Sequence, residues 1–218
     1  MLNLEKPIDS YIFGFIQGDG HLYQQSRNRG KLSIELHVRD KDILEKISGY
    51  FNYNCSIRER TRKTNFSEKH TSAILTACSW ELRKSLVSLG IPYGKKSDII
   101  APPTTAFIKV DYVRGLVDAE GSIGFTSQGF PFVSIAISSE AIYQFYKQFL
   151  FDELGAIKKL NRNTRDNIYN VMVTREDAQQ LVKLLYYKDA FALNRKTKAA
   201  RKVEEWIRLS SIKKRNLY

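Results

Sequence analysis

The sequence contains the same short motif twice, and this internal repeat limits the folds that the chain can adopt. YIFGFIQGDG occupies 11–20 and YVRGLVDAEG occupies 112–121, an offset of 112 − 11 = 101 residues. Tyrosine, glycine, an acid and a final glycine recur at the same places. Such self-similarity indicates two copies of one structural unit. With 218 residues, the chain can form one large domain or two small ones, each with a hydrophobic core.

The segments that follow each motif also match in kind. Each half has an alternating apolar–polar strand, a helix, a basic strand, an apolar strand, a second helix and a basic closing element. In the same order, these segments are 31–40, 42–51, 55–64, 70–79, 80–90 and 94–100 in the first half, and 130–139, 141–150, 156–165, 167–176, 177–187 and 194–200 in the second.

We therefore predict an α+β fold made of two αββαββα repeats related by a pseudo-twofold axis. The N-terminal half is expected at 1–100, a linker at 101–111, and the C-terminal half, with a basic helical tail, at 112–218. Two independent domains on a flexible tether are the alternative. The linker APPTTAFIKVD disfavours them, because it is short and partly apolar.

Small residues lie on one face of each motif when the motif is read as a helix. Gly14 and Gly18 are four residues apart, as are Gly115 and Ala119. This spacing lets two helix backbones approach closely, which compensates for the low helix propensity of glycine. We expect the two motif helices to pack against each other through these faces.

An acid ends each motif helix, just before a glycine at the usual C-cap position. Asp19 and Glu120 therefore lie at the partially negative end of a helix dipole, where acids are destabilising. Packed together, the two helices predict an oxygen-rich, negative site with no local cation, of the kind that binds Mg²⁺. The alternative is two ordinary capped core helices with solvated acids, which the repetition of the pattern disfavours.

The charge balance indicates a polyanionic partner. Lys and Arg number 35 against 23 Asp and Glu, giving a net charge of +12. A merely basic soluble protein is the alternative. Cys55, Cys78 and the three histidines lack metal-site spacing, and we expect neither zinc nor a disulfide framework. Without a membrane span or secretion signal, we expect an intracellular, non-secreted protein located with the host genome, in a prokaryotic or phage-infected cytoplasm or in an organelle.

At residues 12–20 and 113–121 the chain resembles the single-chain, two-motif LAGLIDADG homing endonucleases, and the likeness extends from about Tyr11 to about Arg201. The resemblance implies motif helices at the centre and two curved antiparallel sheets that form a saddle over double-stranded DNA. It also implies a monomer that makes metal-dependent double-strand breaks during intron homing. One departure is Gln17, where the family often has an acid; the second motif keeps Asp118.

The resemblance assigns roles to particular residues. Asp19 and Glu120 match the metal-binding carboxylates, and Gly18 and Ala119 match positions whose backbone carbonyls can add ligands. The implied ions are two or three Mg²⁺, with Mn²⁺ as a substitute and Ca²⁺ binding without supporting cleavage. The bound metal would lower the pKa of the attacking water.

The family also has a basic residue near the end of each half. Lys96 follows its acid by 96 − 19 = 77 residues and Lys196 by 196 − 120 = 76, so we predict that both are catalytic. Lys95 and Lys198 are the alternative pair, and exposed lysines in basic loops are the alternative to any catalytic role.

We expect DNA contacts from basic strands and from the loop before the first strand. Alternate residues of a strand share a face, and Arg and Asn can read guanine and adenine. Base contacts and phosphate contacts are not separable at this level. The expected contacts are Arg27, Arg29, Lys31, Arg58, Arg60, Arg62, Lys159, Asn161, Asn163 and Arg165.

Four other functions fit parts of the pattern. A non-cleaving DNA-binding protein and an intron RNA maturase share this fold, and one chain can combine nuclease and maturase activities. Because both motif acids are present, cleavage is favoured over binding alone. A structural module with accidental glycines predicts no salt-dependent affinity for DNA, whereas a DNA-binding protein has a steep salt dependence.

Overall fold

The computed structural model describes residues 2–64, 67–157, 162–163 and 165–208. The first half contains α1 (Pro7–Asp19), β1 (Gly20–Gln24), β2 (Gly30–His37), a 3₁₀ turn at Val38–Asp40, α2 (Lys41–Tyr50), β3 (Cys55–Thr64), β4 (Ser67–Ala77) and α3 (Trp80–Ser88). The second contains α4 (Lys109–Glu120), β5 (Gly121–Phe125), β6 (Pro131–Ile137), α5 (Glu140–Leu154), β7 (Arg162–Asn163), β8 (Ile168–Thr174), α6 (Arg175–Leu185) and α7 (Asn194–Glu204).

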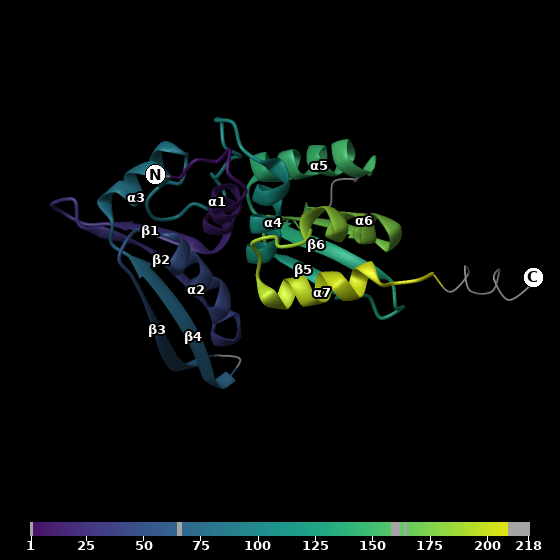
Figure 1. The fold of residues 1–218 in the computed structure, drawn as a ribbon, viewed down its shortest axis with the longest axis horizontal. Helices are drawn as coiled ribbons and strands as arrows, with labels where there is room; N and C mark the ends of the chain where they lie inside the picture. Colours follow the sequence, from purple (N-terminus) through teal and green to yellow (C-terminus); the bar gives the residue numbers. More distant parts are fainter. Residues whose placement is uncertain (1, 65–66, 158–161, 164, 209–218) are drawn as a thin grey trace, which may run out of the picture.

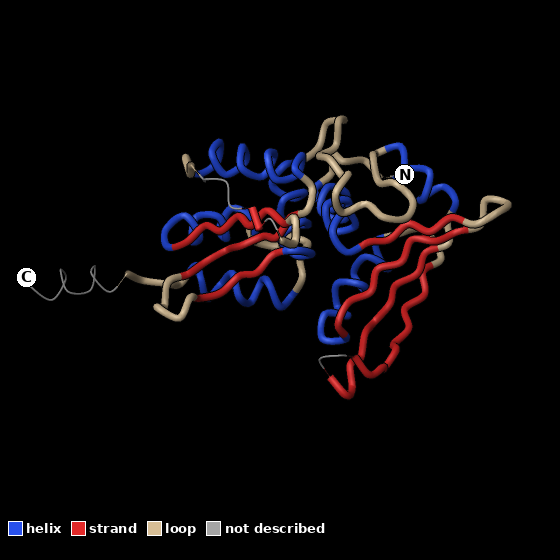
Figure 2. Tube along the Cα trace, turned by 180° about the vertical axis from the view of Figure 1, so that it is seen from behind, coloured by secondary structure: helices blue, strands red, loops and turns tan. Residues whose placement is uncertain are grey.

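The predicted α+β architecture is confirmed (Figure 1). Each half has one antiparallel four-stranded sheet, with strand order β1-β2-β4-β3 in sheet A and β5-β6-β8-β7 in sheet B. The motif helices α1 and α4 pack against each other at the centre of the molecule, and the two sheets extend to opposite sides of this helix pair (Figure 2). The second half also has α7, which has no helical counterpart in the first half.

Helices cover one face of each sheet and leave the other face open. Helices α2 and α3 contact sheet A, and α5, α6 and α7 contact sheet B. Strand residues that face these helices are apolar and buried, as Leu32, Ile34, Val133 and Ile135 show. The residues between them are more exposed, which is the pattern of a half-buried sheet.

The junction between each motif helix and the next strand differs from the prediction. No turn or left-handed cap follows the helix: Gly20 (φ −77°, ψ 148°) and Gly121 (φ −98°, ψ 173°) are extended and begin β1 and β5. Both positions need glycine for space. A Cβ would lie 2.7 Å from the carbonyl oxygen of Ile16 at Gly20, and 2.6 Å from that of Val117 at Gly121.

Several element boundaries also differ. Helix α1 begins at Pro7, before the repeated motif, and α4 begins at Lys109, inside the expected linker. Strand β2 stops at His37, and α6 begins at Arg175, because a helical turn follows each strand directly. Of the expected basic strand at 156–165, residues 162–163 form β7, and residues 158–161 and 164 lie outside the described part of the chain.

Candidate metal centre and nucleic-acid face

The two motif helices are packed at backbone contact distance. A Cβ on Gly14 would overlap the carbonyl oxygen of Tyr112, and one on Gly115 would overlap that of Tyr11. A Cβ on Gly18 would collide with the methyl group of Ala119. The small-residue faces predicted from the sequence therefore lie against each other, and they bring the two helix C-termini together.

Asp19 and Glu120 end the two helices at this point, and neither helix has a basic residue in its own last turn. The pKa of Asp19 is raised to about 7. Burial is the main cause, and the nearby negative charge of Glu120 is the second. Burial also raises the pKa of Glu120. The two carboxylates thus form a site where negative charge is unfavourable unless a cation joins them.

Two buried lysines lie at this site, so the expectation that it lacks a local cation was wrong. Lys96 and Lys196 are 7% and 3% exposed, which also excludes the alternative of exposed loop lysines. Lys96 Nζ donates to the backbone carbonyls of Gly18 (2.5 Å) and Gln17. Lys196 Nζ donates to those of Val117 (2.7 Å) and Gly121. Each ammonium therefore neutralises the negative end of one motif helix.

Burial lowers the pKa of both lysines, and that of Lys196 falls to about 8. The charges of Glu120 and Asp19 oppose this shift at Lys96, whereas Asp118 is the main opposing charge at Lys196. Lys95, the alternative to Lys96, is exposed and pairs with Asp98 at 3.3 Å. Lys198 lines a surface groove beside β5. Neither alternative lysine has the buried contacts of Lys96 and Lys196.

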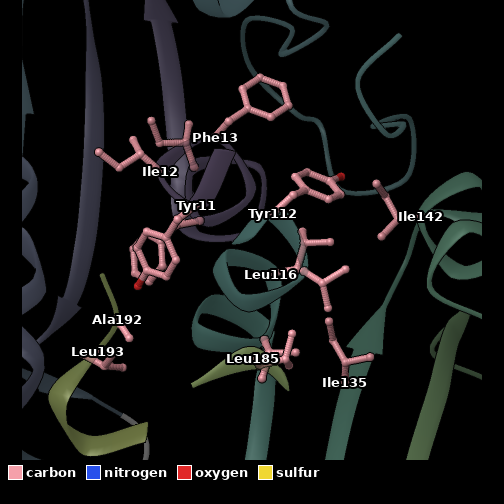
Figure 3. Packing of buried hydrophobic residues seen from close by; sticks show 14 of the residues in the cluster. Tyr11, Ile12, Phe13, Tyr112, Leu116, Ile135, Ile142, Leu185, Ala192 and Leu193 are labelled. Carbon is pink, nitrogen blue, oxygen red and sulfur yellow. The ribbon is translucent and has the colours of Figure 1, made fainter. Parts of the chain in front are cut away.

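The motif tyrosines link each helix to the other motif. Tyr11 Oη donates to Asp118 (2.7 Å), and Tyr112 Oη donates to Gln17 (2.5 Å). These two tyrosines lie on opposite sides of the helix pair (Figure 3). Gln17 and Asp118 thus occupy equivalent positions and accept equivalent bonds, so either an amide or an acid can serve as the acceptor there.

The side chains of Gln17 and Asp118 also form hydrogen bonds with the segments that carry the two lysines. Gln17 Nε2 donates to the carbonyl of Ala101 (2.9 Å), in the segment after Lys96. Asp118 accepts from Leu193 N (2.7 Å), just before α7, and from Tyr186 Oη (2.6 Å).

Contacts from the opposite half reinforce the segment before Lys196. Arg195 makes two hydrogen bonds to Asp40, at 2.9 and 2.8 Å, and Asp40 is 6% exposed. Lys46 Nζ donates to the carbonyl of Ala192 (2.8 Å) and to Asn194 (2.7 Å). The corresponding contact on the other side is neutral, because the hydroxyl of Ser139 (2.5 Å) donates to the carbonyl of Ile100. The Lys196 side is therefore fixed by charged partners and the Lys96 side by uncharged ones.

The residues at the site fit a hard divalent cation. Among the described residues, no three or more His, Cys, Asp and Glu side chains are grouped so that they could hold a metal. Two carboxylates with few other ligands suit Mg²⁺, which keeps several waters and shares its shell with phosphate. Of the two carbonyls predicted as ligands, that of Gly18 already accepts from Lys96. A cavity of about 240 Å³ beside Gly18, Lys96 and Glu120 leaves room for water or a phosphate group.

The arginine row of the first half lies on the open face of sheet A. In the β3–β4 register, Arg58, Arg60 and Arg62 are opposite Ile74, Ser72 and His70, so they share one face as predicted. Glu35 on the same face contacts Arg60 (3.0 Å) and Arg62 (3.5 Å). Two of the three guanidiniums are thus held in place by a carboxylate.

The other predicted contacts of the first half lie at the end of sheet A. Arg27 and Arg29 belong to the β1–β2 hairpin, where Arg27 and Asn28 have left-handed φ angles of 58° and 59°. The buried side chain of Arg83 donates to the carbonyl of Asn28 (2.7 Å) and supports this hairpin. Lys31 lies on β2, opposite Tyr23 of β1.

The predicted contacts of the second half are only partly described. Lys159 and Asn161 lie outside the described residues. Asn163 and Arg165 lie at the β7–β8 turn, where Asn163 Nδ2 donates to Asp166 at 2.9 Å and Arg165 pairs with the same carboxylate at 3.0 Å. The sequence interpretation missed Asn170 and Met172 of β8, which are exposed on the open face of sheet B.

Two contacting motif helices, one terminal acid on each, and two sheets on one chain form the arrangement that was compared with known proteins. Residues 108–186 match the model of the LAGLIDADG-like domain, and the chain as a whole has the two-domain LAGLIDADG homing endonuclease fold. No curated protein sequence matches the chain. No helix in the described residues has the length and apolar character needed to cross a membrane.

Three solved structures illustrate the fold. The homing endonuclease I-WcaI, bound to its DNA recognition sequence, is similar with a TM-score of 0.66 at 13% identity, covering 92% of this chain and 88% of that protein. The LAGLIDADG homing endonuclease I-GzeII, in complex with its DNA target, gives 0.53 at 16% identity and covers 96% and 95%. I-DmoI, in complex with DNA and Mn, gives 0.54 at 14% identity and covers 84% and 97%.

Proposed function

We propose that this chain is a site-specific DNA endonuclease of the homing type, which cuts both strands of a long target with the help of Mg²⁺. The observation that carries this proposal is the pair of carboxylates, Asp19 and Glu120, at the C-termini of two contacting helices, with a buried lysine beside each helix end. Similarity to structures bound to DNA, one of them with Mn, supports the same substrate and a divalent cation.

Asp19 and Glu120 would hold the cation, which supplies an activated water and neutralises charge on the phosphate when it is bound. Lys96 and Lys196 hold positive charge beside the helix ends, where they can stabilise the extra negative charge of the transition state. No described histidine takes part in these contacts. The pseudo-twofold pair gives each DNA strand one carboxylate and one lysine, so a monomer would suffice for a double-strand break.

The decisive experiment is cleavage of a target plasmid, obtained by site selection, in Mg²⁺ and in EDTA. We expect wild type to cut both strands only with Mg²⁺. Asp19→Asn and Glu120→Gln should bind the same duplex and leave it intact, with cleavage reduced at least about 100-fold. Cleavage by the Asp19→Asn, Glu120→Gln double variant would falsify the assignment of these carboxylates.

Binding without cleavage by wild type would instead favour the alternative of a non-cleaving DNA-binding protein. The intron maturase alternative predicts Mg²⁺-dependent binding and splicing of a structured intron RNA, which the same protein preparation can test. The monomer prediction is checked by the mass of the DNA complex, which should contain one chain per duplex.

A further inference from the structure

The open faces of the two sheets differ in charge. In sheet A, the strand registers place four basic side chains and one acid on the open face, a net charge of 4 − 1 = +3 with neutral histidines. These residues are Lys31, Arg58, Arg60, Arg62 and Glu35. A face of this kind attracts phosphates and can donate to guanine.

The described part of the open face of sheet B carries no charged side chain. Along β6 and β8, Val133, Ile135, Val171 and Val173 are buried against the helices, so the residues between them face outward. The outward residues of β5, β6, β7 and β8 are Ser122, Gly124, Phe132, Ser134, Ala136, Asn163, Ile168, Asn170, Met172 and Thr174.

These residues form a largely apolar surface that also carries hydroxyl groups and the two amides of Asn163 and Asn170. Met172 is directly opposite Ser134, and Asn170 is opposite Ala136. Met172 is 49% exposed although it lies in the middle of a strand. The ring of Phe132 lies over Gly124, at 3.5 Å from where a Cβ would be. An exposed apolar surface bordered by Ser and Asn is typical of a binding face.

The chemistry of this surface matches A·T base pairs. Asn can make two hydrogen bonds to the adenine edge in the major groove, and apolar side chains contact the thymine methyl group, which cytosine lacks. No described residue of the face can pair with a phosphate as a cation or form the two-pronged Arg contact to guanine.

Resting on the proposed function, we infer that sheet B reads an A·T-rich half-site, with thymine methyl groups against Met172 and Ala136 and an adenine edge on Asn170. The arginine row of sheet A then adds salt-dependent affinity and reads the other half-site. The two halves share one backbone plan but recognise their half-sites by different interactions.

The test begins with selection of bound duplexes from a randomised library by the Asp19→Asn variant, followed by replacement of thymine by deoxyuracil in one half-site at a time. Deoxyuracil removes only the methyl group. We expect about a four-fold loss of affinity for each contacted thymine in the sheet B half-site, which corresponds to the burial of one methyl group. Met172→Ala should bind thymine and deoxyuracil duplexes about equally at the position it contacts.

Arg60→Ala is the matched control on sheet A. It should leave the deoxyuracil effect unchanged and reduce the slope of log affinity against log salt by about 0.9, the value of one phosphate contact. Met172→Ala should leave that slope unchanged. Because Met172 and Arg60 are both exposed on open faces, neither change removes a core contact.

Two results would overturn the inference while the proposed function stands. One is a G·C-rich site on the sheet B side. The other is a deoxyuracil effect that is absent in wild type or unaltered in Met172→Ala. If the library yields no bound duplex at all, the proposed function itself fails, and the inference fails with it.

Discussion

Replacing Asp19 by asparagine should stabilise the metal-free protein at neutral and alkaline pH. Burial, together with the charge of Glu120, raises the pKa of this carboxyl from 3.8 to about 7. Between these values the folded protein binds more protons than the unfolded chain, so stability falls as pH rises through this window. Asparagine cannot ionise, and the variant avoids this loss.

The size of the effect follows from the shift in pKa. At 1.36 kcal/mol per pKa unit, ionisation of Asp19 costs the folded protein about 4 kcal/mol at pH 8 and about 1.5 kcal/mol at pH 5. The advantage of Asp19→Asn over wild type should therefore grow by about 2.5 kcal/mol from pH 5 to pH 8. Urea denaturation of both proteins in EDTA at the two pH values measures this difference.

Two controls separate this charge effect from other consequences of the substitution. Mg²⁺ should stabilise wild type more than Asp19→Asn, because it binds the folded site through the carboxylate. Asp118→Asn removes a second buried carboxylate but should destabilise at both pH values, because Asp118 accepts from Tyr11, Tyr186 and Leu193 N. Equal stability of wild type and Asp19→Asn at pH 8 would refute the reasoning.

Three further predictions concern the helix pair and the lysines. Gly115→Ala should destabilise the fold by about 1–3 kcal/mol in urea denaturation despite its better helix propensity, because the new methyl overlaps the carbonyl of Tyr11; a stabilised variant would exclude the close packing. Arg195→Ala should slow one strand cut more than the other and accumulate nicked plasmid, because it releases the segment before Lys196 from Asp40. Arg208→Ala, which removes the exposed pair with Glu176, is its control, and equal slowing of both cuts contradicts the prediction. Because burial lowers the pKa of Lys196 to about 8, its charge is lost as pH rises through that value, and cleavage should decline above it; Lys196→Arg should move the decline to higher pH, and an unchanged pH profile would contradict this role.

The features predicted correctly from the sequence were those that recur in both halves. The glycine faces, the terminal acids and the α+β repeat all depend on local spacing, which a repeat makes visible twice. The position of Lys96 and Lys196 beside the helix ends was predicted in the same way, since their nearly equal separation from the motif acids, 77 and 76 residues, recurs in both halves.

Contacts between distant, non-repeated residues were not predictable in this way. Asp118 accepts a hydrogen bond from Tyr11, which is 107 positions away in the sequence, and Arg195 donates to Asp40, which is 155 positions away. The conformation of Gly20 was also missed, because glycine after a helix is most often a left-handed cap, whereas here a strand begins at once. Asn170 and Met172 were not predicted as surface contacts, since only the register of β8 against β6 shows which face of the sheet they occupy.

The glycine contact between α1 and α4 has a consequence for engineering. The separation of Asp19 and Glu120 is set by two helix backbones in contact, and the close contacts of the motif glycines Gly14, Gly18 and Gly115 are with the opposite helix and not with the described residues of the open sheet faces. In a nuclease built this way, the stagger between the two nicks belongs to the helix pair, whereas the choice of bases belongs to the sheets. Under the proposed function, redesigned sheets should therefore redirect cleavage to new sequences and leave the offset between the two cuts unchanged.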